Sequence, residues 1–559
     1  MSEAARVGEA TVLEGHGGGL AVAVARRHGV DTMFTLSGAH VFPLYDGAVK
    51  ADPPMRLVDV RHEQTAVFAA EATAKLTRRP GLAVLTAGPG VTNGISAVTT
   101  AHFNGSPLLV LGGRAPAGRW GTGALQELDH PPLLAPITKH AGTVGEVAAL
   151  AAEVDRALTL AATPHRGPVF LDVPMDQLFS VATAAAPPAA PRQPVVPDPD
   201  ALAGIAALLA EAERPVLVVG SDVWADGADE AAARAASSLR LPVIANGMGR
   251  GVVPPDAGLV VTRARSLALG QADLVLVAGA PLDFRLGYGS FGGRDGAPAA
   301  RVVHLADAAS QLAGHVELAG AAAGDLTAVL DGLVEAVARG RHLPDHGAWL
   351  ERLRTTAAEA AARDQQLLAS GATPIHPARI YGELRRLLAD DAVVIGDGGD
   401  FVSFAGRYVE PARPGGWLDP GPYGCLGTGL GYAIAARLAR PSAQVVLLLG
   451  DGAAGFSLMD VDTLVRHRLP VAMVVGNNGI WGLEKHPMQL LFGYDVAADL
   501  QPGCRYDEVV RALGGAGELV TSPDEVGPAL RRAFEANAPY LVNVATDPKV
   551  AYPRSTTGV

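Results

Sequence analysis

Two short loops in the last third of the chain carry residues that suit a hard metal ion. Asp451 lies in the run Gly-Asp-Gly at 450–452, and Asn478 follows after 26 intervening residues in Asn-Asn-Gly at 477–479. A carboxylate and an amide oxygen, completed by backbone carbonyls and ligand phosphates, suit Mg²⁺. The glycines let the backbone approach a diphosphate closely. The pair predicts a site for Mg²⁺ and a diphosphate, although each run alone is an ordinary turn sequence.

A carboxylate far from these loops is a candidate for proton chemistry. Glu63 follows the apolar run 56–60 and lies in the first turn of a predicted helix. The positive end of the helix dipole favours an ionised carboxylate there, and on its own such a residue would be ordinary helix stabilisation. The loop Gly-Pro-Gly-Val-Thr-Asn at 88–93 follows another apolar run and should open on the same cleft. A simple glycine turn explains each residue of that loop equally well.

The elements that must position these residues are short apolar runs that alternate with helical patterns. Examples are the runs 82–87, 215–220 and 444–450. Continuous apolar strands are buried on both faces, which predicts an α/β fold of three doubly wound parallel-sheet domains. The run 444–449, a helix over 458–468 and the run 471–475 form a right-handed crossover, so both metal loops emerge at one sheet edge. Ligands bind at such edges.

Two stretches divide the chain. The proline-rich segment 181–200 predicts an extended surface linker, and a second boundary lies between residues 339 and 374, around a charged helical stretch. The expected domains are an N-terminal one at 1–185, a central one at 195–345 and a C-terminal one at 370–559. These lengths are ordinary for domains.

Composition narrows the class of protein. The chain has 559 residues and a net charge of −12, and no basic run that would bind nucleic acid. Its two cysteines, Cys425 and Cys504, have no metal-ligand spacing and fit a reducing cytoplasm. The N-terminal residues do not form a signal peptide pattern, and the apolar stretch 81–113 is too interrupted by polar residues and prolines to span a bilayer. A cytoplasmic protein without a membrane or nucleic-acid partner is expected.

Taken together, the motifs resemble the thiamine-diphosphate enzymes of the acetolactate synthase and oxalyl-CoA decarboxylase superfamily over nearly the whole chain. The Gly-Asp-Gly and Asn-Asn-Gly loops on one β-α-β unit match its cofactor signature. The stretches 104–113, 263–273, 418–431 and 450–471 look like those of oxalyl-CoA decarboxylases and 2-hydroxyacyl-CoA lyases. The resemblance implies a pyrimidine-binding, a central nucleotide-binding and a diphosphate-binding domain.

The resemblance implies a 2-hydroxyacyl-CoA lyase that uses thiamine diphosphate and Mg²⁺ to release formyl-CoA and an aldehyde or ketone. An acetolactate-synthase-like carboligase acting on pyruvate is the alternative. A thiamine-diphosphate-binding homologue without turnover is disfavoured, because Glu63, Asp451 and Asn478 are all present. The family's cofactor lies between domains of different subunits, so a homodimer or homotetramer is expected.

Carried over residue by residue, the resemblance assigns Mg²⁺ to Asp451, Asn478 and the Ile480 carbonyl, and makes Glu63 the activator that hydrogen-bonds the cofactor's aminopyrimidine. Gln126 matches a position facing the reacting centre, or else is a surface helix start. Leu426 would hold the cofactor bent, or else be plain core. The remaining residues implied to contact the cofactor are Gly88, Gly424, Gly450, Gly452 and Ala453.

The wall after the metal loop departs from the family pattern. Trp481 stands where the CoA lyases carry tyrosine, and the following helix has a different composition. Glu484 falls about two turns beyond the metal loop and would either exchange a proton with the hydroxyl at the cleaved bond or be solvated helix surface. Some chains with this wall look like proteins labelled acetolactate synthase, which keeps that alternative open.

The central domain has a nucleotide-site layout without a Gly-x-Gly-x-x-Gly run. The acyl-CoA branch places ADP or the adenine end of CoA there, and the synthases place FAD. By resemblance Arg265 and Asp307 would hold phosphate and ribose, or else form a structural ion pair. At the C-terminus, Lys549 or Arg554 would close over CoA phosphates, or else the tail is disordered.

Overall fold

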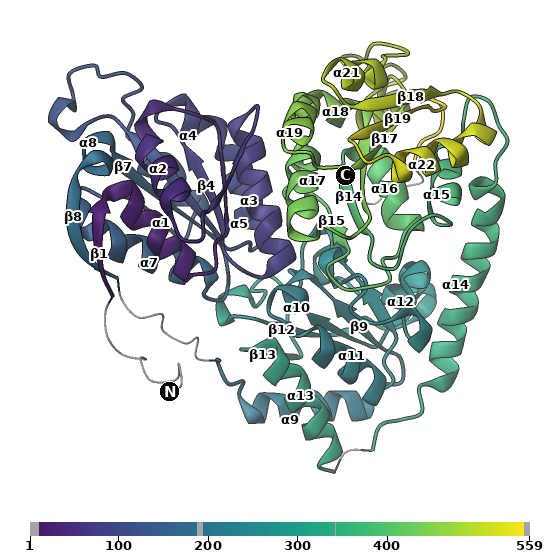
Figure 1. Ribbon diagram of the computed structural model, residues 1–559. Helices are drawn as coiled ribbons and strands as arrows, with labels where there is room; N and C mark the ends of the chain where they lie inside the picture. The colour runs from purple at the N-terminus through teal and green to yellow at the C-terminus, as the bar shows by residue number, and fades with distance from the viewer. Residues whose placement is uncertain (1–10, 187–193, 341, 553–559) are drawn as a thin grey trace, which may run out of the picture.

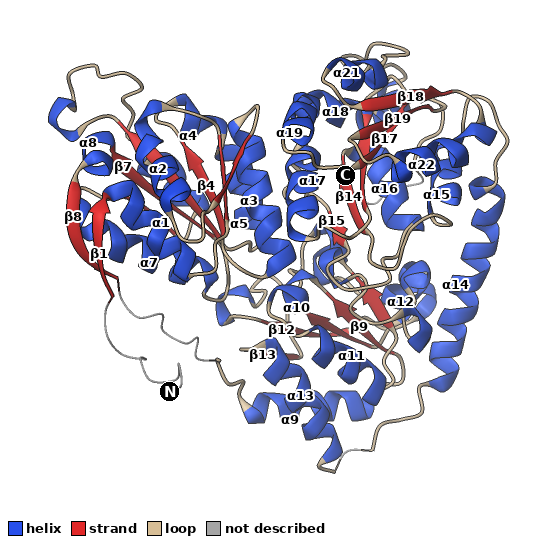
Figure 2. Ribbon diagram, viewed as in Figure 1, coloured by secondary structure: helices blue, strands red, loops and turns tan. Residues whose placement is uncertain are grey.

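The computed structural model describes residues 11–186, 194–340 and 342–552. The chain forms three lobes, each built on one parallel sheet of five or six strands (Figure 1). In every lobe the strands are enclosed between helices (Figure 2). The α/β fold of three parallel-sheet domains is therefore confirmed, and its cause is the burial of each strand on both faces.

The first lobe contains a six-stranded sheet in the order β3-β2-β4-β5-β7-β6. Its strand β4 (Gly81–Leu85) is buried at every position, which explains its continuous apolar run. The other strands of this sheet are β2 (Thr32–Thr35), β3 (Arg56–Asp59), β5 (Leu108–Arg114), β6 (His140–Thr143) and β7 (Pro168–Pro174). The helices are α1 (Gly17–Arg27), α2 (Phe42–Lys50), α3 (Glu63–Thr77), α4 (Pro89–Asn93), α5 (Ile95–Phe103), α6 (Pro131–Leu134), α7 (Leu150–Ala162) and α8 (Met175–Phe179).

The predicted proline-rich linker begins with a strand. Residues 181–186 form β8 (Val181–Ala186), which pairs antiparallel with β1 (Thr11–His16). The extended linker expected over residues 181–200 is therefore wrong for residues 181–186, because these pair with β1 as an antiparallel strand. Residues 187–193 lie outside the described part of the chain.

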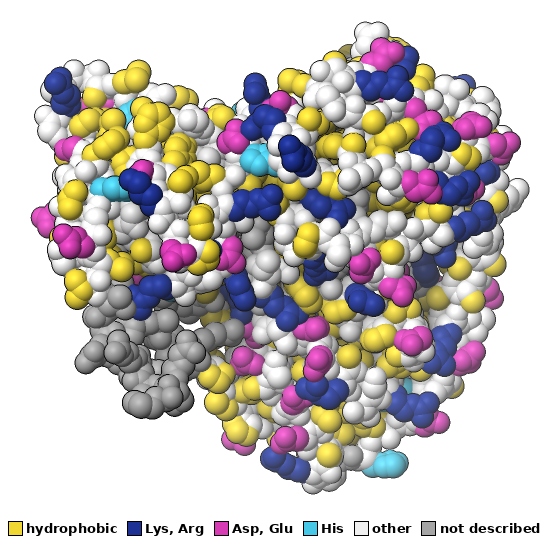
Figure 3. Space-filling view, viewed as in Figure 1, with side chains coloured by type: hydrophobic (Ala, Val, Ile, Leu, Met, Phe, Trp, Pro, Cys, Tyr) yellow, Lys and Arg dark blue, Asp and Glu magenta, His cyan; other side chains and the backbone are white. Residues whose placement is uncertain are grey.

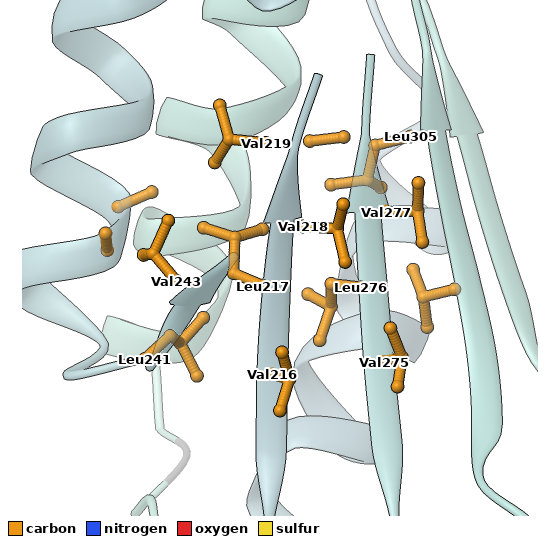
Figure 4. Packing of buried hydrophobic residues seen from close by; sticks show 14 of the residues in the cluster. Val216, Leu217, Val218, Val219, Leu241, Val243, Val275, Leu276, Val277 and Leu305 are labelled. Carbon is orange, nitrogen blue, oxygen red and sulfur yellow. The ribbon is translucent and has the colours of Figure 1, made fainter. Parts of the chain in front are cut away.

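The central lobe contains a five-stranded sheet in the order β10-β9-β11-β12-β13. Valine and leucine side chains of neighbouring strands pack into one layer there (Figure 4). Such branched side chains suit a pleated surface that is buried on both sides. The strands are β9 (Pro215–Val219), β10 (Val243–Ala245), β11 (Leu274–Ala278), β12 (Arg301–Ala306) and β13 (Gly320–Ala323), and the helices are α9 (Pro199–Glu211), α10 (Ser221–Ala225), α11 (Asp229–Ser238), α12 (Arg265–Gln271) and α13 (Leu326–Ala338).

The third lobe contains a six-stranded sheet in the order β15-β14-β16-β17-β19-β18. A helix of 22 residues, α14 (Gly347–Leu368), leads into it along the outer edge of two lobes (right in Figure 1). The strands are β14 (Val393–Asp397), β15 (Trp417–Leu418), β16 (Val445–Gly450), β17 (Ala472–Asn477), β18 (Ala516–Val520) and β19 (Tyr540–Ala545). The helices after α14 are α15 (Pro377–Leu384), α16 (Gly399–Tyr408), α17 (Thr428–Ala439), α18 (Asp451–Ser457), α19 (Val461–Arg466), α20 (Gly482–Phe492), α21 (Tyr506–Ala512) and α22 (Val526–Glu535).

The first and third lobes meet where α3 packs against α17. The buried carboxylate of Asp460 accepts the Arg61 N–H at 2.8 Å and the Thr65 hydroxyl at 2.6 Å. Further along α3, fully buried Glu71 accepts from Asn104 Nδ2 at 2.7 Å and lies 2.9 Å from the Tyr432 hydroxyl. These polar contacts fix the register of the two lobes, because a buried polar group is costly unless it has a partner.

No helix within residues 11–186, 194–340 and 342–552 is both long and apolar enough to cross a membrane.

Candidate active site

The two predicted metal loops meet at one sheet edge. Strands β16 and β17 are parallel neighbours with Gly450 opposite Gly476, so the loops after them lie side by side. Asp451 opens α18, and its Oδ2 accepts the Gly479 N–H at 2.6 Å. Its Oδ1 accepts the Gly452 N–H at 3.0 Å. The crossover geometry expected from the apolar runs thus brings Asp451 to the second loop.

The chemistry of this cluster fits a hard divalent cation. Asp451 is only 4% exposed, and burial raises the pKa of its carboxyl to about 6. A bound cation would favour the ionised form and offset that burial. Partly buried Asn478 supplies an amide oxygen, which accepts the Ile480 N–H at 3.2 Å. A side chain at Gly450 would meet no atom of the described residues within 4 Å, which leaves room beside the carboxylate for phosphate oxygens.

The wall beyond the metal loop is aromatic. The Trp481 ring lies against Gly452, where an added Cβ would come within 2.4 Å of the ring. Phe456 packs edge-on against Trp481 at 6.5 Å between ring centres. Glu484, in contrast, is exposed on α20, a helix without buried residues. Its neighbour Lys485 binds Asp495 and Asp499 at 2.7 and 2.6 Å.

Glu63 opens α3 as the sequence predicts. The His62 side chain caps this helix by accepting the Gln64 N–H at 3.1 Å. The Glu63 carboxylate is 7% exposed, and its Oε2 accepts from Asn93 Nδ2 at 3.0 Å. Gly90 lies beside the other oxygen, since an added Cβ there would be 3.8 Å from Oε1. The structure therefore brings the 88–93 loop to Glu63.

A buried histidine supports the same loop. The Gly88 N–H donates to His130 Nε2 at 2.9 Å, and His130 Nδ1 lies 2.8 Å from Asp172 Oδ2. Partly buried Gln126 lies against Gly88 in a left-handed conformation, with φ of 60°. Sequence reasoning missed His130 and Asp172. The only signal was the position of His130 in the run 125–130 that also contains Gln126.

A third loop approaches from the C-terminal lobe. Buried Asp397 accepts the N–H groups of Gly427 and Gly429 at 3.1 and 2.8 Å, which holds the start of α17. Burial raises the pKa of Asp397 to about 7. Gly424 in this loop has a φ of 69° and is exposed, and Leu426 is only partly buried. Leu426 is therefore not plain core. Asp397 is another residue that the sequence motifs did not single out.

Comparison with known proteins identifies the family. Residues 16–133 match the description "Thiamine pyrophosphate enzyme, N-terminal TPP binding domain", residues 202–333 match its "central domain", and residues 397–544 match its "C-terminal TPP binding domain". This chain belongs to the thiamine pyrophosphate enzymes. Their cofactor, also called thiamine diphosphate, is the one that the two metal loops and Glu63 indicate.

Relatives with two different names resemble this thiamine pyrophosphate enzyme over most of its length. A "Probable acetolactate synthase" of Mycobacterium bovis is 52% identical over 96% of this chain and 97% of the relative. The "Acetolactate synthase large subunit IlvG" of Mycobacterium tuberculosis has the same values. The "2-hydroxyacyl-CoA lyase 2" of Homo sapiens is 33% identical over 91% of this chain and 86% of the relative.

The thiamine pyrophosphate enzyme also contains a cavity of about 720 Å³ where its three lobes meet. Lysine and arginine side chains gather along this junction on the face shown in Figure 3. Neither Arg265 nor Asp307 lines the cavity. Arg265 donates to the Arg285 carbonyl at 2.6 Å, and burial lowers its pKa to about 10. Asp307 is 2% exposed and bonds His165. The basic residues that do line the cavity are Lys75, Arg78, Lys139, Arg166 and Arg285.

Near the C-terminus, the backbone N–H of Lys549 donates a hydrogen bond to the Asp547 side chain. Arg554 lies outside the described residues.

Proposed function

We propose that this enzyme is a carboligase of the acetolactate synthase type, which joins an activated 2-keto acid such as pyruvate to a second keto acid. The observation that carries the proposal is the 52% identity to two proteins named acetolactate synthase over nearly the whole of both chains. The lyase that the sequence motifs favour becomes the second candidate, since proteins with that name are 33 to 34% identical.

The residues of this chain have separable roles in such a reaction. We infer that Asp451, Asn478 and the Ile480 carbonyl hold Mg²⁺, and that the glycine-rich turns at 450–453 admit the diphosphate. Thiamine diphosphate supplies, when bound, a carbanion equivalent and an electron sink for bonds to carbonyl carbon. Glu63, almost enclosed and held by Asn93, would keep a proton at the cofactor's pyrimidine nitrogen. Trp481 and Phe456 would exclude water from the reacting centre.

We also infer an assembly of more than one chain with active sites between subunits. The support is the surface next to the metal loop, where Leu490, Leu491 and Phe492 at the end of α20 are 76%, 64% and 65% exposed. A large exposed apolar patch of this kind marks an interaction surface. Both a dimer and a tetramer would cover it. The free thiols of Cys425 and Cys504 are consistent with the expected cytoplasmic location.

The decisive experiment offers the purified enzyme, with Mg²⁺ and thiamine diphosphate, pyruvate in one assay and a 2-hydroxyacyl-CoA in another. We expect acetolactate from pyruvate, detected by its conversion to acetoin in acid. Release of formyl-CoA without any acetolactate would replace the carboligase with the lyase. A preparation that binds the cofactor but turns over neither substrate would favour the third alternative, a homologue without activity.

The lyase candidate is favoured by one specific feature, the cavity between the three lobes that lysine and arginine side chains line. Its volume and its lysine and arginine lining suit the phosphates of a CoA ester. ADP or FAD would suit the same cavity, so we propose a nucleotide-bearing ligand there. Cleavage of a hydroxyacyl bond needs a group that accepts the hydroxyl proton, and exposed Glu484 is the candidate. Glu484→Ala should then abolish formyl-CoA release while leaving acetolactate formation within about twofold.

A further inference from the structure

A buried pair of side chains lies behind the loop that carries Asn93 to Glu63. His130 and Asp172 both have side chains with 0% exposure. They come from separate segments, His130 from the turn before α6 and Asp172 from strand β7. Asp172 Oδ2 also accepts from Arg114 Nη1 at 2.9 Å. A buried histidine and carboxylate this close form a fixed unit, because their desolvation is offset by their mutual contact and by the bonds from Arg114 and Gly88.

The contacts assign the proton on the imidazole ring. A backbone amide can only donate, so His130 Nε2, which receives the Gly88 N–H at 2.9 Å, must be the bare nitrogen. The ring proton therefore lies on Nδ1, which faces Asp172 Oδ2 at 2.8 Å. This assignment follows from the hydrogen-bond network. Asp172 thus selects the one neutral tautomer that can accept from Gly88.

Gly88 is the point at which the loop needs support. It precedes α4 with a φ of 58° and ψ of −114°, a conformation that side chains disfavour. From there the chain turns through Pro89 and Gly90 to Asn93, whose amide donates to Glu63 at 3.0 Å. Gln126 packs on the other side of Gly88, where an added Cβ would come within 2.9 Å of its Cβ. The hydrogen bond to Gly88 therefore holds the start of the turn that leads to Asn93, together with the backbone bonds of Gly90 and Thr92.

We propose that His130, held by Asp172, is a positioning residue for cofactor activation: by accepting the Gly88 N–H it fixes the turn that sets Asn93 on Glu63. The proposal rests on the role proposed above for Glu63. His130 itself stays behind the loop and acts only through it. Displacement of a reacting group by about 1 Å typically costs on the order of 100-fold in rate, so the loss of this single bond should be measurable.

The test measures exchange of the cofactor C2 proton for deuterium in the holoenzyme, together with the affinity for thiamine diphosphate. His130→Ala should lower the exchange rate by roughly 10- to 100-fold and the cofactor affinity by less than about threefold. His130→Gln should recover most of the rate, because its carboxamide can accept from Gly88 and donate to Asp172 with the same spacing. The matched control is His346→Gln, since His346 is also buried and bonds a backbone group, the Ala212 carbonyl, in another domain.

Asp172→Asn provides a second, independent variant. An asparagine amide in place of the carboxylate lets the ring adopt the other tautomer, whose Nε2–H would face the Gly88 N–H. Exchange should then fall although the histidine is still present. Asp172→Asn still tests the positioning role if His130→Ala does not fold, because the asparagine substitution removes no volume from the core.

The outcomes separate this proposal from the proposed function. If Glu63→Gln exchanges its C2 proton at the wild-type rate, the role of Glu63 is wrong and the present proposal falls with it. If Glu63→Gln loses exchange while the His130 and Asp172 variants keep the wild-type rate, only the positioning role is overturned. The positioning role is also overturned if exchange in the His130 and Asp172 variants falls only in proportion to the cofactor that they lose. It is overturned as well if the control His346→Gln lowers the exchange rate as much as His130→Ala does.

Discussion

At the scale of single residues, the Asp451 carboxylate combines two properties that conflict without a ligand. It is buried, and both of its oxygens accept backbone N–H groups, from Gly452 and Gly479. Those amides orient the carboxylate but do not offset a full negative charge. A cation beside it would do so. Asn478 supplies oxygen without charge, so Asp451 should contribute most of the electrostatic attraction at this site.

Asp451→Asn should therefore raise the Mg²⁺ concentration needed for half-maximal cofactor binding by about tenfold or more, because the charged ligand becomes neutral. Titration of Mg²⁺ at fixed thiamine diphosphate, followed by the quenching of tryptophan fluorescence, measures this. Asp524→Asn is the control, since the Asp524 side chain is 89% exposed on the same lobe. An unchanged Mg²⁺ requirement in Asp451→Asn would remove this residue from the metal site.

The sequence predicts Asp451, Asn478 and Glu63 as site residues because each follows a recognisable strand end with a characteristic residue type. It could not predict His130, whose partners Gly88 and Asp172 each lie 42 residues away. A single histidine in a sequence does not show which groups its ring nitrogens will contact in the folded protein. The same limit affects Arg265: its charge suggests a phosphate ligand, but its guanidinium is directed at the Arg285 carbonyl.

At the scale of elements, the crossing of α3 and α17 is the tightest contact between the first and third lobes. Gly431 makes it possible, because an added Cβ would lie 2.7 Å from Phe68 Cβ and 3.0 Å from the Thr65 carbonyl. Two helices can approach so closely only where one has no side chain. The crossing therefore requires a residue without a side chain at position 431.

Gly431→Ala should lower the free energy of unfolding by about 1 to 3 kcal/mol, the usual cost of overpacking. Gly455→Ala on α18 is the matched control, since an added Cβ there meets nothing within 4 Å and alanine favours the helix. Denaturant unfolding followed by circular dichroism measures both variants. Equal stability of the two would show that the crossing relaxes freely around the extra methyl group.

The sequence predicts helix and strand positions well where a run of apolar residues is long. It predicts them less well in the glycine-rich loop after β16. The apolar runs correspond to β4, β9 and β16, and the helix expected at Glu63 is α3. The helix expected at 458–468 corresponds to α19 with the 3-10 turn Leu458–Asp460 before it, whereas the separate short helix α18, which begins at Asp451, was not expected. At the start of α18 the Asp451 carboxylate accepts the Gly452 N–H, a stabilisation that the glycine-rich sequence does not reveal.

At the scale of the whole molecule, one cluster joins the first lobe to the central one. His165 Nδ1 lies 3.1 Å from Asp307 Oδ1, and Asp222 is part of the same group. Burial would lower the pKa of His165, but the Asp307 hydrogen bond and the charge of Asp222 outweigh it and raise the pKa. The pKa of Asp222 is raised as well, in this case by burial of its carboxylate. Arg166 and Lys139 add positive charge nearby.

Both raised pKa values act in the same direction on stability. The folded cluster binds its protons more tightly than the unfolded chain, so stability falls as the pH rises through the folded pKa values. Wild-type protein should lose more thermal stability than Asp222→Asn as the pH rises from about 4 to about 7, because the pKa of Asp222 is raised from its ordinary value to about 7 in the folded protein. Melting temperatures of both proteins across that range measure the effect, with Asp524→Asn as the exposed control. A difference that stays constant with pH would contradict it.

The loop between β15 and α17 has two neighbours at once. Asp419, Gly421 and Pro422 line the junction cavity, and Gly424 and Leu426 follow within a few residues on the side proposed for the cofactor. An added Cβ at Gly421 would come within 1.8 Å of the Asn104 side chain, so the loop packs tightly against Asn104 at this position. On the ligand assignments proposed above, a change in this loop would therefore affect binding in the cavity and binding of the cofactor together. A graft that retargets the enzyme to another nucleotide-bearing ligand should exchange the whole loop together with Asn104.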